Sequence, residues 1–299
     1  MKNVVFILFA AIVLFACEKD DMIDSEPNEK SAKKKLSMSF EGLSALGPDY
    51  RYEGWLIVDG MPVSTGKFNI TPSGQMSPKV FNVKKDYVDR ANMFVLSIEP
   101  QPDSDPNPSK TKILGGTFSG GMADLTIMHD AALGTNFSSS MGKYILATPT
   151  NGPDTNEKSG IWFLDLTPSG PMTGLTLPAL PDGWIYEGWT VIDGVPVTSG
   201  KFDMLSGEVD MFDGYSSMEN PGPPFPGEDY LMNAPKGLSF PTDISGGTAV
   251  ISVEPYPDNS PEPFAVKPLT AMIPNDAMDH VTYLMNLNAG SFPTGMVKR

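Results

Sequence analysis

YEGWLIVDGMPVSTGKF, residues 52–68, decides the fold class of this chain. Both halves of the segment are rich in aromatic and β-branched residues, which favour β-strands. Asp59-Gly60 stands between the halves, and Asp-Gly tolerates the positive φ angles of a two-residue hairpin turn. We therefore expect a β-hairpin in which Trp55 lies opposite Ser64.

The hairpin segment recurs 134 residues later as YEGWTVIDGVPVTSGKF, residues 186–202. A second match, FVLSIEPQPDSDPNP at 94–108 and AVISVEPYPDNSPEP at 249–263, has an offset of 155 residues. The difference indicates a loop insertion of about twenty residues in the second copy, around 204–247. Two copies in the same order predict two homologous domains.

The remaining sequence also favours β structure. Further short strands are predicted at 125–128, 144–147 and 161–164. Gly and Pro punctuate these strands, and this pattern predicts an all-β chain of two tandem Ig-like β-sandwich domains. We assign the first domain to residues 36–150 and the second to 157–299. An alternative boundary at 167–173 would place the strand 161–164 in the first domain.

The amino terminus has the pattern of an export signal. An apolar run of twelve residues, VVFILFAAIVLF at 4–15, follows Lys2. It is shorter than the roughly 20 residues that span a bilayer and suits a signal peptide. The run ends in LFAC, which resembles the bacterial lipobox. This resemblance implies removal of residues 1–16 and acylation of Cys17, for example with palmitate, so we expect an outer-membrane lipid anchor.

Residues 17–35 are polar and predict a disordered tether. The tetrapeptide EKDD, residues 18–21, resembles the export tag of Bacteroidetes-type surface lipoproteins, and the resemblance implies display on the cell surface. An ordinary solvated tether is the alternative interpretation.

Charge excludes nucleic acid as a partner. The formal net charge of the chain is −15, and loss of the signal peptide removes Lys2 alone among its charged residues. Basic clusters in the mature chain are limited to Lys33–Lys35 and Lys84-Lys85, whereas phosphate backbones are bound by larger groups of Lys and Arg. Since acylation occupies the one cysteine, we expect a fold that depends on burial without disulfides.

Few residues suggest catalysis. His129 and His280 lie in no metal-binding or catalytic motif, and the chain contains no G-x-S-x-G or P-loop pattern. The sequence therefore predicts a non-enzymatic protein without a cofactor. We expect Trp55 and Trp189 to fill cores or the face between sheets.

Glu53 and Glu187 suggest a carboxylate pair for glycoside cleavage, but they belong to different copies. Lys67 and Lys201 lie nearly opposite them across the two hairpins. A cross-strand ion pair, worth up to about 1 kcal/mol, is the simpler interpretation.

Acidic side chains lie at and after the Glu-Pro pair that ends one predicted strand in each copy, which we call the E-P strand. They are Glu99, Asp103 and Asp105 in the first copy and Glu254, Asp258 and Glu262 in the second. Oxygen ligands at such spacing can hold Ca²⁺, so calcium binding is one hypothesis. The other is a rigid, solvated turn, because the sequence departs from the calcium-loop pattern and prolines interrupt it.

Both copies resemble the extracytoplasmic domain of anti-sigma-K factors. The matching positions are Tyr52, Trp55, Gly60, Pro62, Ser64, Gly66, Phe68, Glu99 and Pro100, and in the second copy Tyr186, Trp189, Gly194, Pro196, Gly200, Phe202, Glu254 and Pro255. The resemblance implies an extracytoplasmic β-sandwich of sensory or adhesive lineage. It does not imply anti-sigma activity, because a lipobox stands where those proteins have a cytoplasmic segment and a membrane helix.

We therefore expect an envelope lipoprotein that binds another envelope protein or has a sensory or structural role. The alternative is a glycan-binding surface lipoprotein, and a hydrolase is the third possibility. Glycan binding would require an exposed aromatic platform formed by Trp184, Tyr215, Phe225 and Tyr230.

Overall fold

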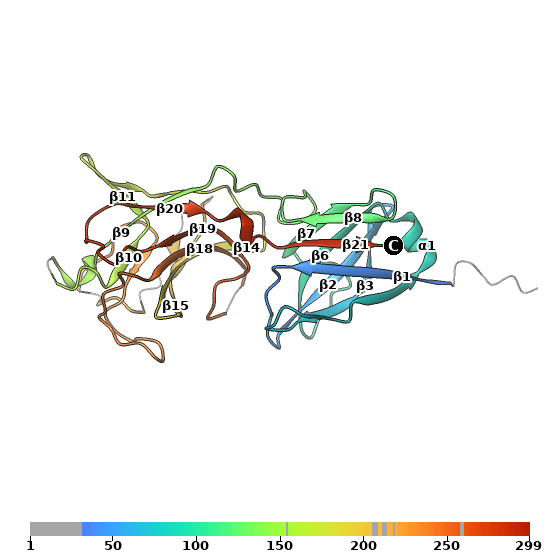
Figure 1. The fold of residues 1–299 in the computed structure, drawn as a ribbon, viewed down its shortest axis with the longest axis horizontal. Coiled ribbons are helices and arrows are strands. Elements are labelled where there is room, and N and C mark those ends of the chain that lie inside the picture. Colours follow the sequence, from blue (N-terminus) through green and yellow to red (C-terminus); the bar gives the residue numbers. More distant parts are fainter. Residues whose placement is uncertain (1–31, 154, 205–208, 211–213, 218, 258–259) are drawn as a thin grey trace, which may run out of the picture.

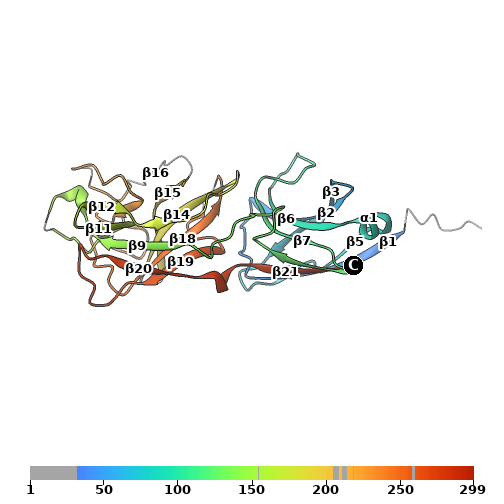
Figure 2. The same ribbon diagram turned by 90° about the horizontal axis from the view of Figure 1, so that it is seen from above.

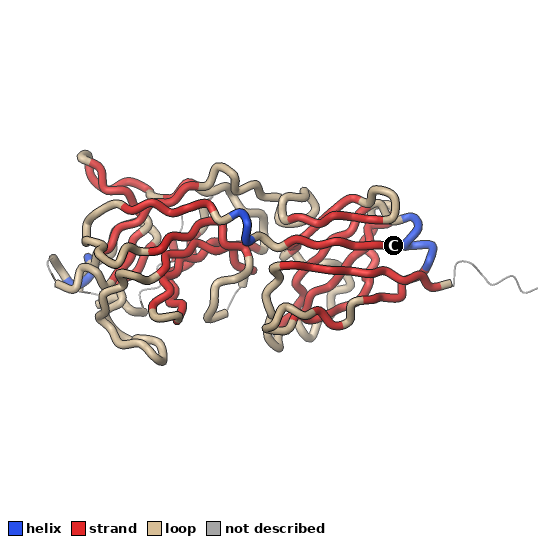
Figure 3. Tube along the Cα trace, viewed as in Figure 1, coloured by secondary structure: helices blue, strands red, loops and turns tan. Residues whose placement is uncertain are grey.

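The computed structural model describes residues 32–153, 155–204, 209–210, 214–217, 219–257 and 260–299. Strands form most of the regular structure in this part of the chain, as Figure 3 shows. Its helices are α1 (Lys85–Arg90) and the single 3-10 turns η1 (Pro149–Asn151) and η2 (Ala289–Ser291). None of these described helices is long and apolar enough to cross a membrane. The all-β prediction is confirmed.

The first sheet is built mainly from the first sequence copy. Its nine strands, from edge to edge, are β4 (Met76–Ser77), β3 (Met61–Ile70), β2 (Tyr50–Val58), β6 (Met93–Pro100), β7 (Lys112–Thr117), β8 (Met122–Thr126), β21 (Thr294–Lys298), β1 (Lys33–Glu41) and β5 (Val80–Lys84). The sheet curls until β5 contacts β3. An Ig-like sandwich has two facing sheets, whereas the strand pairing here forms one curled sheet.

The second sheet repeats this strand order. In matching positions it contains β16 (Val209–Asp210), β15 (Val195–Phe202), β14 (Trp184–Ile192), β18 (Thr248–Pro255), β19 (Val266–Met272), β20 (Tyr283–Leu287), β9 (Met141–Leu146), β10 (Gly160–Trp162) and β17 (Gly227–Asp229). Strand β13 (Leu175–Thr176) also pairs with β9, and β11 (Leu164–Thr167) pairs with β12 (Gly170–Thr173). The predicted insertion includes β16 and β17. Residues 205–208, 211–213 and 218 of that insertion lie outside the described part.

The two hairpins form as predicted. Trp55 pairs with Ser64 across β2 and β3. The turn residues Asp59 and Gly60 have φ angles of 50° and 80°, and the turn between β14 and β15 repeats these values within one degree. Each hairpin also contains a register shift directly before its Trp, between Gly54 and Trp55 in the first and between Glu187 and Trp189 in the second. The local sequence therefore sets the register of both hairpins.

The last strand of each sequence copy pairs in the sheet of the other copy. Strand β9, which ends the first copy, lies between β20 and β10 in the second sheet. Strand β21, which ends the second copy, lies between β8 and β1 in the first sheet. Figures 1 and 2 show this exchange from two sides, with red β21 beside blue β1. The two sheets are therefore joined by reciprocal strand exchange.

This exchange corrects the predicted strand ranges of the two domains. The range 36–150 included β9, which pairs in the second sheet, and 157–299 included β21, which pairs in the first. Of the strand predicted at 161–164, Ile161 and Trp162 belong to β10 and pair in the second sheet, whereas Leu164 begins β11, which pairs with β12. The periodic sequence predicted strands but not their partners, because any exposed strand edge offers the same backbone groups.

The connections that carry the exchanged strands meet between the sheets. The rings of Phe137 and Phe292, one from each connection, have their centroids 5.5 Å apart. Gly142 on β9 and Gly295 on β21 both lie against neighbouring side chains. A Cβ atom at Gly142 would come within 2.8 Å of the Met285 sulfur, and one at Gly295 would approach the ring of Phe40 to 2.6 Å. Small residues therefore allow both exchanged strands to enter their sheets.

Buried apolar residues of both sheets form one contiguous cluster. It includes Tyr52 and Phe94 of the first sheet and Tyr186 and Val253 of the second. A smaller cluster around Trp162 is separate from it. Because the main cluster continues across both sheets, the two halves form one packed body.

Strand β1 begins at Lys33. The last three residues predicted as tether, Lys33–Lys35, therefore belong to the first sheet. Their side chains are exposed or half-buried, so their polarity is compatible with an outer strand. The rest of the predicted tether, the signal peptide and Cys17 lie outside the described residues.

Candidate functional site

A chain of buried hydrogen bonds lies on the face of β2 and β6 opposite the core. The indole N–H of Trp55 donates to Ser97 Oγ at 2.7 Å, and the Ser97 hydroxyl donates to the Glu99 carboxylate. The backbone N–H of Ser109 donates to the same carboxylate at 2.9 Å. These bonds satisfy polar groups that are almost fully buried. They also fix the turn after β6 to the sheet.

The second sheet repeats this network. Trp189 donates to Ser252 at 2.8 Å, Ser252 donates to Glu254, and the Phe264 backbone N–H donates to Glu254 at 2.9 Å. Both tryptophans are buried, but their indoles take part in polar networks outside the main core cluster. The role of the serines is not evident from the sequence alone, although S-x-E-P recurs in both copies.

The predicted cross-strand ion pairs are present. Lys67 Nζ lies 3.6 Å from Glu53 and 2.9 Å from Asp103, and Lys201 lies 3.9 Å from Glu187. Although desolvation opposes its charged form, the bond to Asp103 and the charge of Glu53 raise the pKa of Lys67. The bond from Lys67 lowers the pKa of Asp103. Glu53 and Glu187 therefore belong to separate ion pairs on two sheets.

The structure does not gather the described calcium candidates around one point. Burial raises the pKa of Glu99, whose carboxylate accepts hydrogen bonds from serine and backbone donors. Asp103 pairs with a lysine, Asp105 accepts a backbone N–H at 2.9 Å, and Glu254 repeats the role of Glu99. Asp258 lies outside the described residues. In the described part of the chain, no three His, Cys, Asp or Glu side chains could hold a metal ion.

The two histidines occupy separate turns. His129 accepts the Ala131 backbone N–H at 3.2 Å and lies 3.3 Å from the Thr117 hydroxyl. His280 has a φ of 53° and lies 3.1 Å from Asp279. These contacts explain both side chains as parts of local turn structure.

His280 lies near an open polar hollow of about 470 Å³. The lining residues are Asn156, Glu157, Lys158, Ser159, Pro241, Thr242, Asp243 and Asp279. The Ser159 hydroxyl donates to the Tyr230 carbonyl at 2.6 Å and accepts the Thr242 N–H at 2.7 Å. That serine therefore holds two segments of backbone together, which is a structural role.

A cleft of about 300 Å³ lies between the two sheets. Its first wall is the loop before β2, and its second is the turn after β18. The described lining residues are Ser44, Ala45, Leu46, Gly47, Asp49, Tyr50, Ile98, Pro255, Pro257, Ser260, Pro261, Glu262, Pro263 and Phe264. The surface is largely apolar, and Asp49 and Glu262 supply carboxylates from opposite walls.

Hydrogen bonds hold both walls to their sheets. The Arg51 guanidinium donates to the carbonyls of Gly47, Pro48 and Tyr50 at 3.2, 3.0 and 2.6 Å. On the opposite wall, Phe264 is held by the bond from its N–H to the buried Glu254 carboxylate. The repeated network around the E-P strands therefore positions one side of the cleft.

The aromatic platform required for glycan binding is not exposed. Trp184 and Tyr230 are buried in the main core cluster, and Tyr215 packs against it. Phe225 packs against the smaller cluster around Trp162. These four side chains stabilise the second half of the molecule instead of forming a surface for sugar rings.

The chain matches no protein-family model, and comparisons with curated proteins and with solved structures give no match. The resemblance to anti-sigma-K factors therefore stays a prediction.

Proposed function

We propose that this chain is a non-enzymatic lipoprotein of the bacterial outer membrane that binds an envelope partner in the cleft between its sheets. In this proposal, the chain is related to the extracytoplasmic domains of anti-sigma-K factors. Cys17 provides the lipid anchor, and EKDD after it directs the protein to the cell surface. The cleft gives this binding role a definite location.

The observation that carries the binding role is that each wall of the cleft comes from a different sheet. Reciprocal exchange of β9 and β21 ties these sheets together. Binding sites commonly lie at such junctions. Hydrogen bonds from Arg51 and to Glu254 hold the described parts of the two walls, and a site held in this way before binding loses less conformational entropy when its ligand binds.

The lining favours an apolar peptide segment that carries a basic side chain. Leu46, Tyr50 and Phe264 offer apolar contacts, and Asp49 and Glu262 offer negative charge. Prolines in one wall limit its conformational freedom. This surface lacks converging catalytic groups in its described part, which supports binding in preference to hydrolysis.

Photo-crosslinking in intact cells tests the cleft. A photoreactive amino acid at Ala45 or Ser260, one on each wall, should yield the same discrete protein adduct. The same probe at Asn286, exposed on β20, serves as the control. Absence of adducts from both walls, or an identical adduct from Asn286, would reject this binding site.

Lipid labelling tests the anchor separately. Cys17→Ser should abolish incorporation of labelled palmitate and leave the signal peptide attached. Equal incorporation by this variant would exclude Cys17 as the acylated residue. In the wild type, removal of the protein by protease added to intact cells would support surface display, whereas full protection would contradict it.

A further inference from the structure

Two basic segments that are far apart in the sequence become neighbours in the first sheet. Strand β1 pairs with β5, and Lys33 lies opposite Lys84. Partners in antiparallel strands have Cα atoms about 4.5 to 5.5 Å apart. The strand pairing therefore joins the clusters Lys33–Lys35 and Lys84-Lys85 into one surface.

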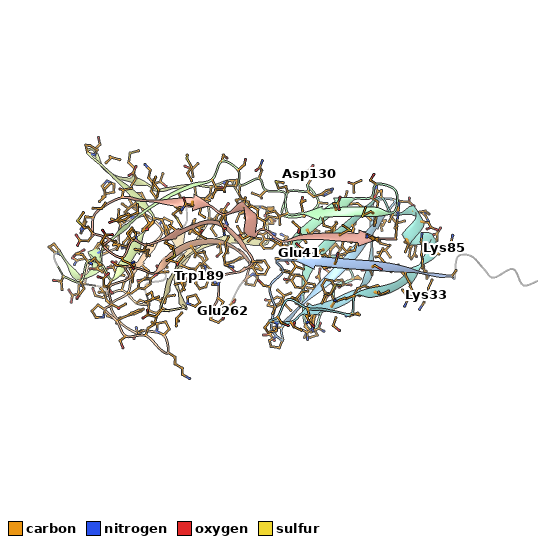
Figure 4. All side chains as sticks on the ribbon, viewed as in Figure 1. Lys33, Glu41, Lys85, Asp130, Trp189 and Glu262 are labelled. Carbon is orange, nitrogen blue, oxygen red and sulfur yellow. The ribbon has the colours of Figure 1, made fainter. Side chains whose placement is uncertain are left out.

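The exchanged strand β21 extends this surface. Lys298 pairs with Ser37 on β1, two residues beyond Lys35. Lys33, Lys35, Lys84 and Lys298 are all exposed, and none has an ion pair among the described residues. We call these four residues the basic end. Figure 4 places Lys33 and Lys85 at the same end of the molecule, far from Trp189 in the second sheet.

Nearby acids neutralise other basic side chains. Lys34 and Lys85 pair with Asp89, at 2.7 and 2.9 Å, and Arg90 pairs with Asp86 and Asp59. These pairs leave the four lysines of the basic end as the local charge excess. This excess stands on a chain whose net charge is −15.

Asp124, exposed on β8, lies at the edge of the basic end, because it pairs with Met296, two residues before Lys298. Strand β1 itself carries no acid between its lysines and Glu41. Glu41 is at the opposite end of β1, eight residues from Lys33, and a strand rises about 3.3 Å per residue. The two are therefore about 26 Å apart, whereas exposed charges are screened over about 8 Å at physiological salt. A surface that touches the basic end experiences mainly positive charge.

We propose that the basic end docks on anionic lipid headgroups and orients the body on its membrane. This inference rests on the proposed anchor at Cys17, which lies only 16 residues before Lys33. Lysine ammonium groups attract anionic lipid surfaces, and a basic patch strengthens attachment by acyl chains. With its basic end on the membrane, the molecule points the second sheet and the cleft away from the bilayer.

The acidic segment between Cys17 and the first sheet competes with lipid headgroups for the basic end. Residues 18–30 contain six Asp or Glu and two Lys, so this segment could neutralise the basic end within the chain. Such occupancy would prevent membrane docking. Lipid vesicles and a tether variant distinguish the two outcomes.

The experiment uses the mature chain, residues 17–299, with Cys17→Ser and no acyl group. Its partition is measured on vesicles containing about one-third phosphatidylglycerol and on pure phosphatidylcholine vesicles. Lys33→Gln/Lys84→Gln should weaken anionic-vesicle binding about 25-fold, about fivefold for each charge removed. Lys158→Gln/Lys236→Gln removes the same charge from the second half and should leave partition unchanged. Matching melting temperatures would establish that both variants fold.

Preference for anionic vesicles, its loss in the basic-end variant and weakening by salt would support the proposal. Equal binding to both vesicle types, or equal loss in both lysine variants, would overturn it. A further variant has the Asp and Glu residues of its tether converted to Asn and Gln. The proposal would also be overturned if the wild-type chain bound neither vesicle type while this variant bound anionic vesicles. Lipid labelling at Cys17 is measured separately, so failure of the anchor and failure of electrostatic docking give different results.

Discussion

Val297→Ala in the last strand should destabilise the first sheet. Val297 is fully buried and lies between Met38 on β1 and Ala123 on β8. The substitution removes two methyl groups, each worth about 0.8 kcal/mol. The remaining cavity raises the expected loss in unfolding free energy to about 2 to 3 kcal/mol. For a chain of this size, the melting temperature should fall by about 4 to 10 °C.

Native-state hydrogen exchange identifies the sheet that is weakened. In Val297→Ala, peptides containing β1 and β8 should exchange faster before those containing β14 and β18. Leu146→Ala provides the reciprocal test, because Leu146 is fully buried on β9 and pairs with Ile161 in the second sheet. This variant should increase exchange in β10 and β20.

If each repeat formed its own sheet without strand exchange, the hydrogen-exchange result would be the opposite. In that arrangement, Val297→Ala would loosen β20 and leave β1 and β8 protected. That result would refute reciprocal strand exchange. Urea unfolding of both variants supplies a control, because a loss well below 1 kcal/mol would show that the substituted side chain is not buried in either sheet.

Three further perturbations test the local and shared structure. Cleavage between residues 152 and 156 should leave two fragments that co-elute on gel filtration until denaturant separates them, whereas spontaneous separation would contradict strand exchange. Gly60→Ala should reduce the free energy of unfolding by about 1 to 2 kcal/mol because Gly60 has a φ of 80°. Gly290→Ala is the control. A Cβ atom has open space at both positions, but only Gly60 has a positive φ. Glu99→Gln should gain stability relative to wild type between pH 4 and 7, because burial raises the Glu99 pKa and its ionisation weakens the folded state as pH rises. Urea unfolding measures the last two effects, and the pH interpretation fails if the difference is constant or has the opposite sign.

Local sequence predicts the hairpins well because neighbouring residues determine them. Asp59-Gly60 permits the turn, and the alternating side chains restrict its register. Similar reasoning explains the ion pair between Glu53 and Lys67, since residues opposite each other across a hairpin must be close. The same sequence pattern predicted the second copy correctly.

The candidate site was less visible in the sequence. The tryptophan–serine–glutamate networks depend on the strand pairing that places Trp55 and Ser97 within 2.7 Å. The cleft also requires a loop from each half, and Asp49 is far from Glu262 along the chain. Sequence alone therefore supplied the types of residue but did not identify which of them share a wall.

The sequence by itself determined the β-rich composition, the duplicated hairpins and their local register. Tertiary structure decided that β1 pairs with β5, which joins the two basic segments, and that β9 and β21 exchange places, which adds the last strand to the same end. The physical reason is that backbone hydrogen bonds can complete more than one strand edge. Selection of a particular edge depends on the connections, on the Phe137–Phe292 contact between them and on side-chain packing across the whole molecule.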